Sequence, residues 1–497
     1  MLRHALRPAP GIALVSMLAT IAACGGGVIA PGSSGTNSSS SGSGAGSGSS
    51  GSGAGSGSSS GASGSSTSGS GGGGPGTDAG GPSPAAYPGH GFVVHEWGTD
   101  TIVVGSDGTP QRGLHHEEED LPAFVYDRIK AAQELGGPPS VEVKMETPVT
   151  YFYSDKPLAV SASVDFPQGV FTQWYPGVGS FAPSVAGPGS ELGSQPTTYA
   201  DPTLDVSFPF QNQTCRDHYT QIAGGHLDWG TVEVLPRGSP AQLLDAPLAQ
   251  FSWSYARQVA SNPVRTQGGQ LEQFLFYRGL GNFELPARVT ASTAGGIVLA
   301  NQYAQAMGPV FVLDVGATSG AFKSHPEGIA PGASLSDVAP SLEGAPGLDA
   351  YAQALGEAVT SALESVGLYH DESVAMVSTW NRQWFRTPGL RLLYIAPQSW
   401  TEASIPLTVQ PAPDATTRVM LIRVEVLTPE IEAADVQAAG GLASTTTAAQ
   451  AGAYFTALGR FAEPRLRRAL ALLGNPSYGD TLLAQVATAN TDVSSGE

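Results

Sequence analysis

Three things are scarce in this chain of 497 residues: cysteine, basic side chains and long apolar segments. Lys and Arg together number 23 against 42 Asp and Glu, which gives a formal net charge of −19. A surface with this excess of negative charge repels a phosphate backbone, so nucleic acid is not expected as a partner. An acidic surface favours solubility and is compatible with cation binding, but it does not determine a fold.

The apolar segment near the N-terminus, 11–23, is too short to cross a bilayer, which takes about 20 residues. It follows Arg3 and Arg7 and ends in small residues before Cys24, an order typical of an export signal. With a cysteine at the cleavage point, the segment resembles the lipobox of bacterial lipoproteins. This resemblance implies that Cys24 becomes the first residue of the mature chain and carries lipid, palmitate included, that anchors it in the membrane. The alternative is an ordinary signal peptide with an incidental cysteine.

The residue after the cysteine, Gly25, does not resemble an inner-membrane retention signal, so the resemblance implies an anchor in the outer membrane. The second cysteine, Cys215, then has no partner within the chain, and the exported fold must be stable without a disulfide. We interpret Cys215 as a small buried apolar residue and not as a nucleophile.

Composition divides the chain into five parts. Residues 1–23 are the signal peptide, and 24–86, almost entirely Gly, Ser and Ala, predict a disordered tether. A flexible tether of this length reaches roughly 40–45 Å, enough to hold a folded domain clear of a membrane surface. A β-rich domain is expected over 87–340, an α+β region, separate or packed on that domain, over 341–480, and a tail over 481–497.

The predicted fold class is mainly β with an α+β C-terminal part: a β-sandwich or barrel-like region followed by several C-terminal helices. Helical spacing predicts helices over 121–135, 350–366, 369–385 and 445–474, the last interrupted at Pro464. Along 369–385, we expect Val374, Met376, Val377, Trp380 and Trp384 to share one face. Alternating or β-branched runs predict strands over 92–94, 101–104, 141–145, 151–153, 158–166, 170–175, 204–210, 231–235, 250–255, 273–277, 287–291, 310–315, 391–395, 405–409 and 418–427. The turn 105–108 is expected to open a hairpin.

One motif occurs twice. His95-Glu-Trp-Gly-Thr99 has a near copy in 226–231, where Asp228 stands in the place of the glutamate. His95 and Trp97 are two residues apart and would share one face of a strand, whereas His226 and Trp229 are three apart. Either the second copy contains a bulge or the two histidines have different roles. The alternative to a site is that both tryptophans are core anchors and both histidines bond locally.

The histidines and carboxylates of these segments suggest a site for zinc or another divalent metal. Its candidate ligands are His95, Glu96, His115, His116, His226 and Asp228, with Glu117 and Glu118 nearby. Neither H-E-x-x-H nor H-x-x-E-H occurs, which excludes the familiar metalloprotease helix. For the acidic run ending at Asp120, the alternative is a solvated cap at a helix N-terminus.

Two further groups have functional and structural interpretations. The aromatic residues of 251–255 and 380–385 predict a sugar-binding platform or, preferably, core packing. Glu146, Glu272 and Glu284 could supply the paired carboxylates of a glycoside hydrolase, a mechanism that requires a defined separation between them.

Several motifs together resemble a family of exported bacterial proteins of unknown function. Where that family usually has an aromatic residue after the motif threonine, this chain has Asp100. The resemblance covers roughly 90–430 and implies no activity. Its motifs are His95-Glu-Trp-Gly-Thr99, Met145-Glu-Thr-Pro148, Tyr151-Phe-Tyr153, Gly225-His-Leu-Asp-Trp-Gly230, Phe276-Tyr-Arg-Gly279 and the aromatic region 367–385.

The leading hypothesis is a lipid-anchored envelope protein whose β-rich ectodomain binds a ligand outside the cytoplasm. Its alternative is a metal-dependent hydrolase that uses the His/Glu/Asp cluster, and a third possibility is a purely structural surface protein. The sequence is compatible with an enzyme and with a binding protein.

Overall fold

The computed structural model describes residues 87, 89, 91–114, 117, 121–127, 141–182, 223–239, 251–440 and 445–489. Of the described residues, 39% lie in strands and 28% in helices. The helices lie mostly in the C-terminal half, and the described strands close no barrel. The predicted class, mainly β with an α+β C-terminal part, is confirmed. None of the helices in the described ranges is long and apolar enough to cross a membrane.

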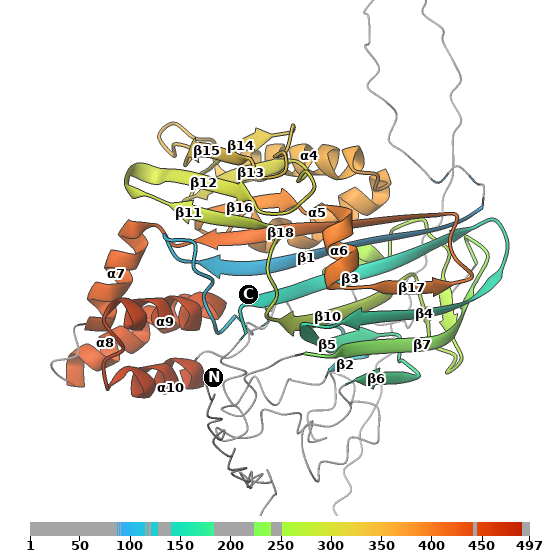
Figure 1. The fold of residues 1–497 in the computed structure, drawn as a ribbon, viewed down its shortest axis with the longest axis horizontal. Helices are drawn as coiled ribbons and strands as arrows, with labels where there is room; N and C mark the ends of the chain where they lie inside the picture. Colours follow the sequence, from blue (N-terminus) through green and yellow to red (C-terminus); the bar gives the residue numbers. More distant parts are fainter. Residues whose placement is uncertain are drawn as a thin grey trace, which may run out of the picture. The chain divides into compact units, whose positions relative to one another are not determined.

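The strand that carries the first motif, β1 (Phe92–Val104), is the central strand of a nine-stranded sheet (Figure 1). It pairs in parallel with β18 and antiparallel with β3. Every residue of β1 and β3 is buried, as expected of strands covered on both faces. The spatial order is β14 (Gly320–His325), β13 (Val310–Val315), β16 (Gly389–Ile395), β18 (Ala415–Val426), β1, β3 (Val143–Ser154), β10 (Leu275–Gly281), β5 (Gly169–Tyr175) and β2 (Tyr126–Asp127).

One face of this sheet packs against two smaller sheets and α6 (Gln398–Ser404), and we call the core between them the inter-sheet core. It includes Val94 of β1, Leu227, Leu299 and Trp400. One smaller sheet has the order β17 (Leu407–Gln410), β4 (Leu158–Phe166), β7 (Gly225–Val234), β8 (Val264–Thr266) and β9 (Leu271–Glu272), with β6 (Ser180–Ala182) also paired to β7. The other contains β11 (Ala287–Ala291), β12 (Gly296–Asn301) and β15 (Ser334–Val338), with the short η1 (Thr293–Gly295) before β12.

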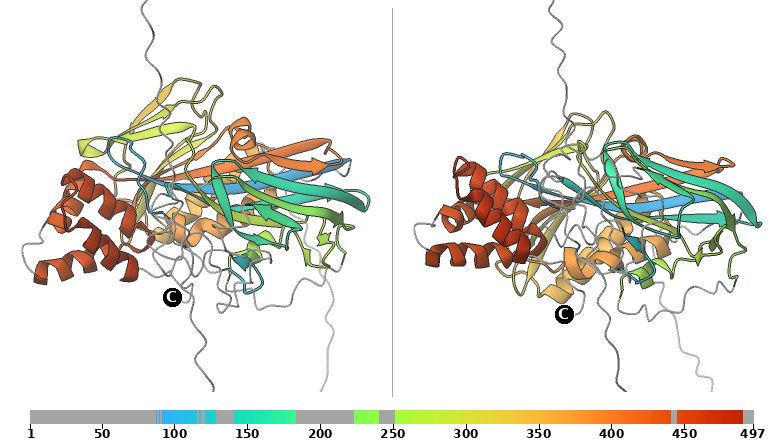
Figure 2. Two further views of the ribbon diagram at one scale, coloured as in Figure 1. Left: turned by 60° about the horizontal axis from the view of Figure 1, so that its bottom comes forward. Right: turned by 90° about the horizontal axis from the view of Figure 1, so that it is seen from below.

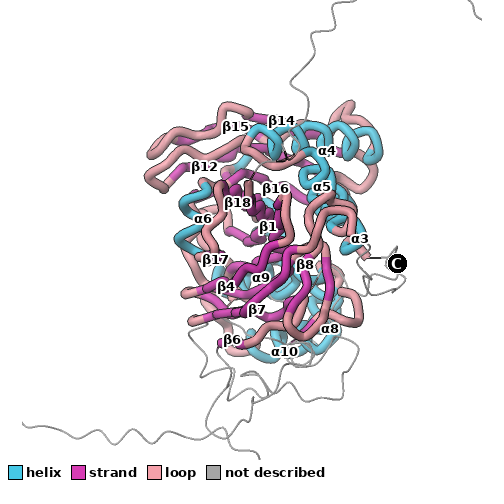
Figure 3. The backbone as a smooth tube through the Cα atoms, turned by 90° about the vertical axis from the view of Figure 1, so that its right-hand side faces the viewer, coloured by secondary structure: helices cyan, strands magenta, loops and turns pink. Residues whose placement is uncertain are grey.

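The opposite face of the large sheet is covered by α3 (Trp253–Ala256), α4 (Leu348–Ser365) and α5 (His370–Trp384). We call the apolar cluster beneath them the helix-side core; it joins Val93 and Trp97 of β1 to Leu355 of α4 and Met376 and Trp380 of α5. Figure 3 shows α4 and α5 on one side of β1, β16 and β18 and α6 on the other.

The remaining helices form a bundle with a core of its own at one end of the large sheet (Figures 1 and 2). They are α7 (Pro429–Gly440), α8 (Thr445–Thr456), the short η2 (Gly459–Phe461), α9 (Ala462–Leu472) and α10 (Gly479–Ala489). The predicted interruption of 445–474 is confirmed, but it falls before Pro464, which lies in the first turn of α9 where a proline is tolerated.

Strands from both sides of the boundary predicted at residue 340 lie in the large sheet. β13 and β14 precede that boundary, β16 and β18 follow it, and the four are neighbours. The β-rich part and the α+β part therefore share their largest sheet, and all described residues belong to one compact unit. The strand predicted at 204–210 lies outside the described residues.

Three local predictions were wrong. Residues 121–127 form a turn and β2 instead of the start of a helix, because Tyr126 and Asp127 pair with β5. The predicted strand 250–255 is replaced by α3, which buries Trp253 and leaves Tyr255 exposed. The turn at 105–108 forms, but among the described residues after it a single bridge, Val104 to Pro110, joins the chain to β1, in place of an extended hairpin.

Candidate functional site

The motifs at 95–99, 145–153 and 276–279 lie on three adjacent strands, β1, β3 and β10, where the strand register is irregular. The pairing of β1 with β3 shifts between Trp97 and Thr99, and that of β10 with β3 shifts between Phe276 and Gly279. A Cβ on Gly98 would lie 3.0 Å from Pro148 Cγ and 3.1 Å from Met420 Cε, so the motif requires glycine for this close approach.

His95 is buried and fixes the beginning of α5. Its Nδ1 lies 2.9 Å from Oε2 of Glu372, and because a carboxylate only accepts, Nδ1 carries the proton. Glu372 is fully buried in the first turn of α5. Its Oε1 accepts a hydrogen bond from the hydroxyl of Tyr153 (2.7 Å), and its Oε2 accepts one from the backbone N–H of Tyr369 (2.7 Å). The motif histidine thus ties β1 to the N-terminal end of α5.

Glu96 points to the opposite face of β1 and has its own partners. Its Oε1 accepts from Arg418 Nη2 (2.6 Å), and its Oε2 accepts from the hydroxyls of Tyr277 (2.6 Å) and Thr150 (2.8 Å). Burial, and after it the charge of Glu96, raise the pKa of Tyr277 well above its usual value, so this hydroxyl remains a donor. His95 and Glu96 therefore cannot ligate one ion, and their predicted joint role is corrected.

The second copy of the motif serves a different sheet. The register of β4 and β7 skips Trp229, which confirms a bulge, and Trp229 donates its Nε1–H to the carbonyl of Pro176 (3.0 Å) within the inter-sheet core. His226 Nδ1 lies 2.7 Å from Asp165 Oδ1 near the surface, and Asp228 accepts the backbone N–H of Gly230 (2.7 Å). Both tryptophans are core residues, and the two histidines have separate carboxylate partners.

Among the described residues, the other predicted ligands do not form a metal-binding cluster either. His115 and His116 lie outside the described residues, as does Glu118. Glu117 is buried and paired with Lys144 Nζ and Arg278 Nη1, both at 2.7 Å. Burial alone would raise the pKa of Glu117, but these two cations lower it to about 2. Because its side chain is buried and paired, Glu117 is not part of a solvated cap. Within the described ranges, no three His, Cys, Asp or Glu side chains are grouped as a metal site.

Of the three glutamates considered for glycoside hydrolysis, Glu146 and Glu272 form internal contacts, whereas Glu284 is exposed. Glu146 pairs with Arg460 of η2 and accepts from Thr101 (2.8 Å), and Glu272 pairs with Arg257 (2.6 Å). Both carboxylates are buried, so neither faces a sugar in solution. The aromatic residues Trp253, Trp380 and Trp384 are likewise packed in the protein interior, since all three belong to the helix-side core.

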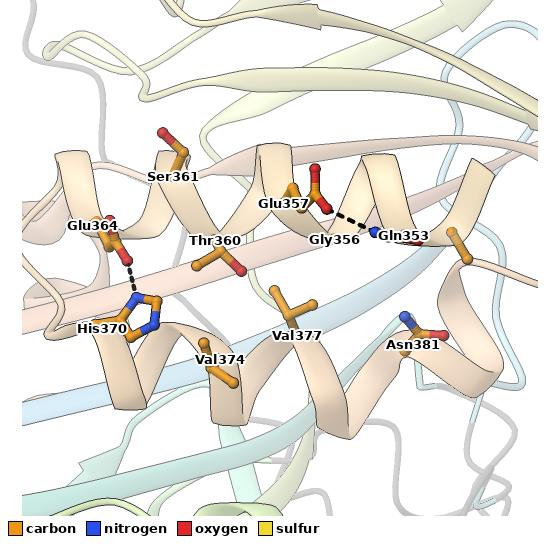
Figure 4. A pocket seen from close by; sticks show the side chains of 11 residues that line it. Gln353, Gly356, Glu357, Thr360, Ser361, Glu364, His370, Val374, Val377 and Asn381 are labelled. Atoms are coloured by element: carbon orange, nitrogen blue, oxygen red, sulfur yellow. Dashed lines mark hydrogen bonds and ion pairs between the residues drawn. The ribbon is translucent and has the colours of Figure 1, made fainter. Parts of the chain in front are cut away.

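A concave surface lies elsewhere, between α4 and α5 (Figure 4). The groove has a volume of about 480 Å³. From α5 it is lined by His370, Val374, Val377 and Asn381, whose spacing follows one helical face. From α4 it is lined by Ala352, Gln353, Gly356, Glu357, Thr360, Ser361 and Glu364.

The single apolar face expected on α5 is in fact two faces. Met376, Trp380 and Trp384 are buried in the helix-side core, whereas Val374 is 42% exposed and lines the groove with Val377. Positions 374 and 376 lie about 200° apart around a helix, so Val374 turns away from the sheet, whereas the partly buried Val377 lines the groove and also packs against the helix-side core. The sequence signal for this groove was the presence of apolar residues on more than one face of the helix 370–381.

The motif and the groove are connected through α5. His95 holds its first turn, and Trp97 and Thr379 line the same small cavity, of about 20 Å³, beneath its inner face. Glycine at 356 lets the two helices approach, because a Cβ there would lie 3.3 Å from Val377 Cγ1. The buried motif therefore sets the position of the helix that forms one wall of the groove. Comparison of the chain with protein-family models and with curated proteins gave no match.

Proposed function

We propose that this chain is a lipid-anchored protein of the cell envelope whose folded part binds a ligand outside the cytoplasm, in the groove between α4 and α5. The observation that carries the proposal is the contrast between the two candidate surfaces. The groove is open and about 480 Å³ in volume, within the range of ligand sites. His95 and Glu96 are instead buried, and each is committed to partners within the protein.

The residues that line the groove favour a role in binding over a role in catalysis. It offers amides, hydroxyls and two carboxylates around an apolar floor. Its one histidine, His370, is hydrogen-bonded through Nδ1 to Glu364 (2.6 Å), with no described serine or threonine hydroxyl bonded to either. Polar groups that orient a ligand and an apolar floor that it can cover are the usual features of a recognition surface.

Photo-crosslinking in the cell that makes the protein tests this function. A photoreactive amino acid replaces Ser361, which is exposed in the groove, in the full-length chain. The proposal expects an adduct with an envelope component. The matched control replaces Glu343, which is exposed before α4 and does not line the groove, and is expected to give no such adduct. Identical adducts from both positions, or none from 361, would contradict the proposal.

The anchor has a separate test. A Cys24→Ser chain is expected to lose its lipid label and to leave the membrane fraction, because a cysteine thiol is needed for the lipid bond. A variant that sediments with the membrane and carries the same label as the parent would show that Cys24 is not the anchor.

The metal-dependent hydrolase remains the alternative, and elemental analysis of the purified full-length chain decides it. The binding proposal expects that chelation leaves crosslinking from position 361 unchanged. Stoichiometric zinc, together with a hydrolytic activity lost on chelation, would favour the hydrolase.

A further inference from the structure

The charges of the groove indicate what kind of partner it takes, and this inference rests on the function proposed above. We propose that the α4–α5 groove binds an amphipathic helix of a partner protein that carries two basic residues two turns apart, on either side of an apolar contact.

The negative charge of the groove comes from Glu357 and Glu364, and no Lys or Arg is among its described lining residues. The two carboxylates are seven residues apart on α4, which is about 10.5 Å along the helix axis. In each carboxylate one oxygen has a hydrogen-bond partner at the groove: Glu357 Oε1 accepts from Gln353 (3.1 Å), and Glu364 Oε1 lies 2.6 Å from His370 Nδ1. In both cases Oε2 is the oxygen that a cation would meet.

Between these acids α4 presents the short side chains of Thr360 and Ser361 to the groove. Thr360 projects into it midway between Glu357 and Glu364, opposite Val374 and Val377 of α5 (Figure 4). The 42% exposure of Val374 leaves apolar surface that a partner would cover. Thr360 is short enough to let a third helix approach α4 closely.

A helix matches this arrangement better than an extended peptide does. Residues i and i+7 of a helix lie on one face and about 10.5 Å apart, the same spacing as the two acids, and residues i+3 and i+4 lie between them on that face. Lys or Arg at i and i+7 would therefore meet Glu364 and Glu357 while Leu at i+3 or i+4 covers Val374. Helix-in-groove recognition uses this i, i+3, i+4, i+7 set.

Two synthetic peptides of one composition separate this geometry from simple charge attraction. The first is an Ala-rich helix with Lys at i and i+7 and Leu at i+3 and i+4. The second moves one Lys to i+5, about 140° from the first around the helix, so that only one Lys can face the groove. Binding of each labelled peptide to the purified full-length chain is measured by fluorescence anisotropy at low and at physiological salt.

The first peptide is expected to bind about two- to fivefold more tightly than the second, with the difference reduced by salt. The double variant Glu357→Lys with Glu364→Lys is expected to lose at least about tenfold in affinity, since attraction becomes repulsion at both positions. The control with the same change in net charge, Glu343→Lys with Glu402→Lys, alters two exposed acids outside the groove lining and is expected to stay within about twofold.

Equal binding of the two peptides, or an equal loss in the control variant, would overturn the basic-helix proposal. An adduct from position 361 in cells, with no peptide bound in solution, would overturn it as well while the proposed function stands. Absence of both the adduct and peptide binding would overturn the proposed function together with this inference.

Discussion

Asp100, the residue after the motif threonine, is fully buried within β1. In the described part of the chain, neither of its carboxylate oxygens has a hydrogen-bond partner. Burial, followed by the charge of Glu146, raises the pKa of Asp100 well above its usual value. The folded chain therefore keeps a proton that the unfolded chain releases. The contribution of Asp100 to stability is fully present below about pH 4 and is lost as the pH rises toward its folded-state pKa.

Asp100→Asn is accordingly expected to stabilise the protein at pH 7 by about 1–3 kcal/mol, because an amide needs no proton to be neutral. The gain should shrink toward zero at pH 4. Thermal unfolding across this pH range measures it, with Asp349→Asn, at a carboxylate 94% exposed, as the control. A gain that is the same at pH 4 and pH 7 would argue against a buried neutral acid.

His95 and Glu372 give the second prediction for single residues. His95→Ala leaves the fully buried Glu372 without one of its three partners and is expected to cost about 2–4 kcal/mol in the free energy of unfolding. His370→Ala, at the exposed histidine of the same helix, should change it by no more than about 0.5 kcal/mol. Denaturant titration of both variants measures the difference. Equal effects would show that His95 does not anchor the first turn of α5 to β1.

At the scale of elements, the strands were the most predictable part of the chain, because alternation and β-branched residues are local signals. The predicted strands at 158–166 and 310–315 coincide with β4 and β13. The helix expected from 121 fails because pairing of Tyr126 with Trp174 of β5 is a contact over a long stretch of sequence, which local spacing does not encode. The site was less predictable for the same reason: the partner of His95 lies 277 residues away.

At the scale of elements, the irregular pairing of β1 with β3 leads to a prediction. Gly98→Ala would place a Cβ about 3 Å from Pro148 and Met420 and is expected to destabilise the fold by about 1–3 kcal/mol. Gly452→Ala is the matched control, because it lies in α8 with nothing within 4 Å of the added Cβ. There alanine should stabilise by up to about 1 kcal/mol. Opposite signs in denaturant titration are the expected result, and destabilisation by both would contradict this account of Gly98.

For the whole molecule, a buried charge pair connects the α7–α10 bundle to the large sheet, and further buried charges pair within the sheet. Arg460 of η2 pairs with Glu146 of β3, and on β18 Glu425 pairs with Arg423 (2.7 Å) and with Arg391 of β16 (3.0 Å). Burial would raise the pKa of Glu425, but the charges of Arg391 and Arg423 outweigh it and lower that pKa. Sequence alone did not predict this connection, since its members are single charged residues scattered from 146 to 460.

Arg460→Leu is expected to loosen the bundle, because Glu146 would remain buried without its cation, at a cost of about 3–5 kcal/mol. Hydrogen exchange should accelerate in α9 and α10 while the amides of β1 and β3 stay protected. Arg265→Leu, which breaks an exposed pair with Glu233, serves as the control and should leave exchange unchanged. Faster exchange throughout the large sheet would show that Arg460 stabilises the fold as a whole and does not specifically dock the bundle.

The central claim is that the buried motif strand positions α5 so that the groove can bind. It is tested most directly by photo-crosslinking from position 361 in two full-length chains, the parent and a His95→Ala variant whose β-sheet circular dichroism is unchanged. The account predicts an adduct in the parent and its loss in the variant, because the first turn of α5 is no longer held to β1. Equal adducts in both chains, or no adduct in the parent, would contradict it.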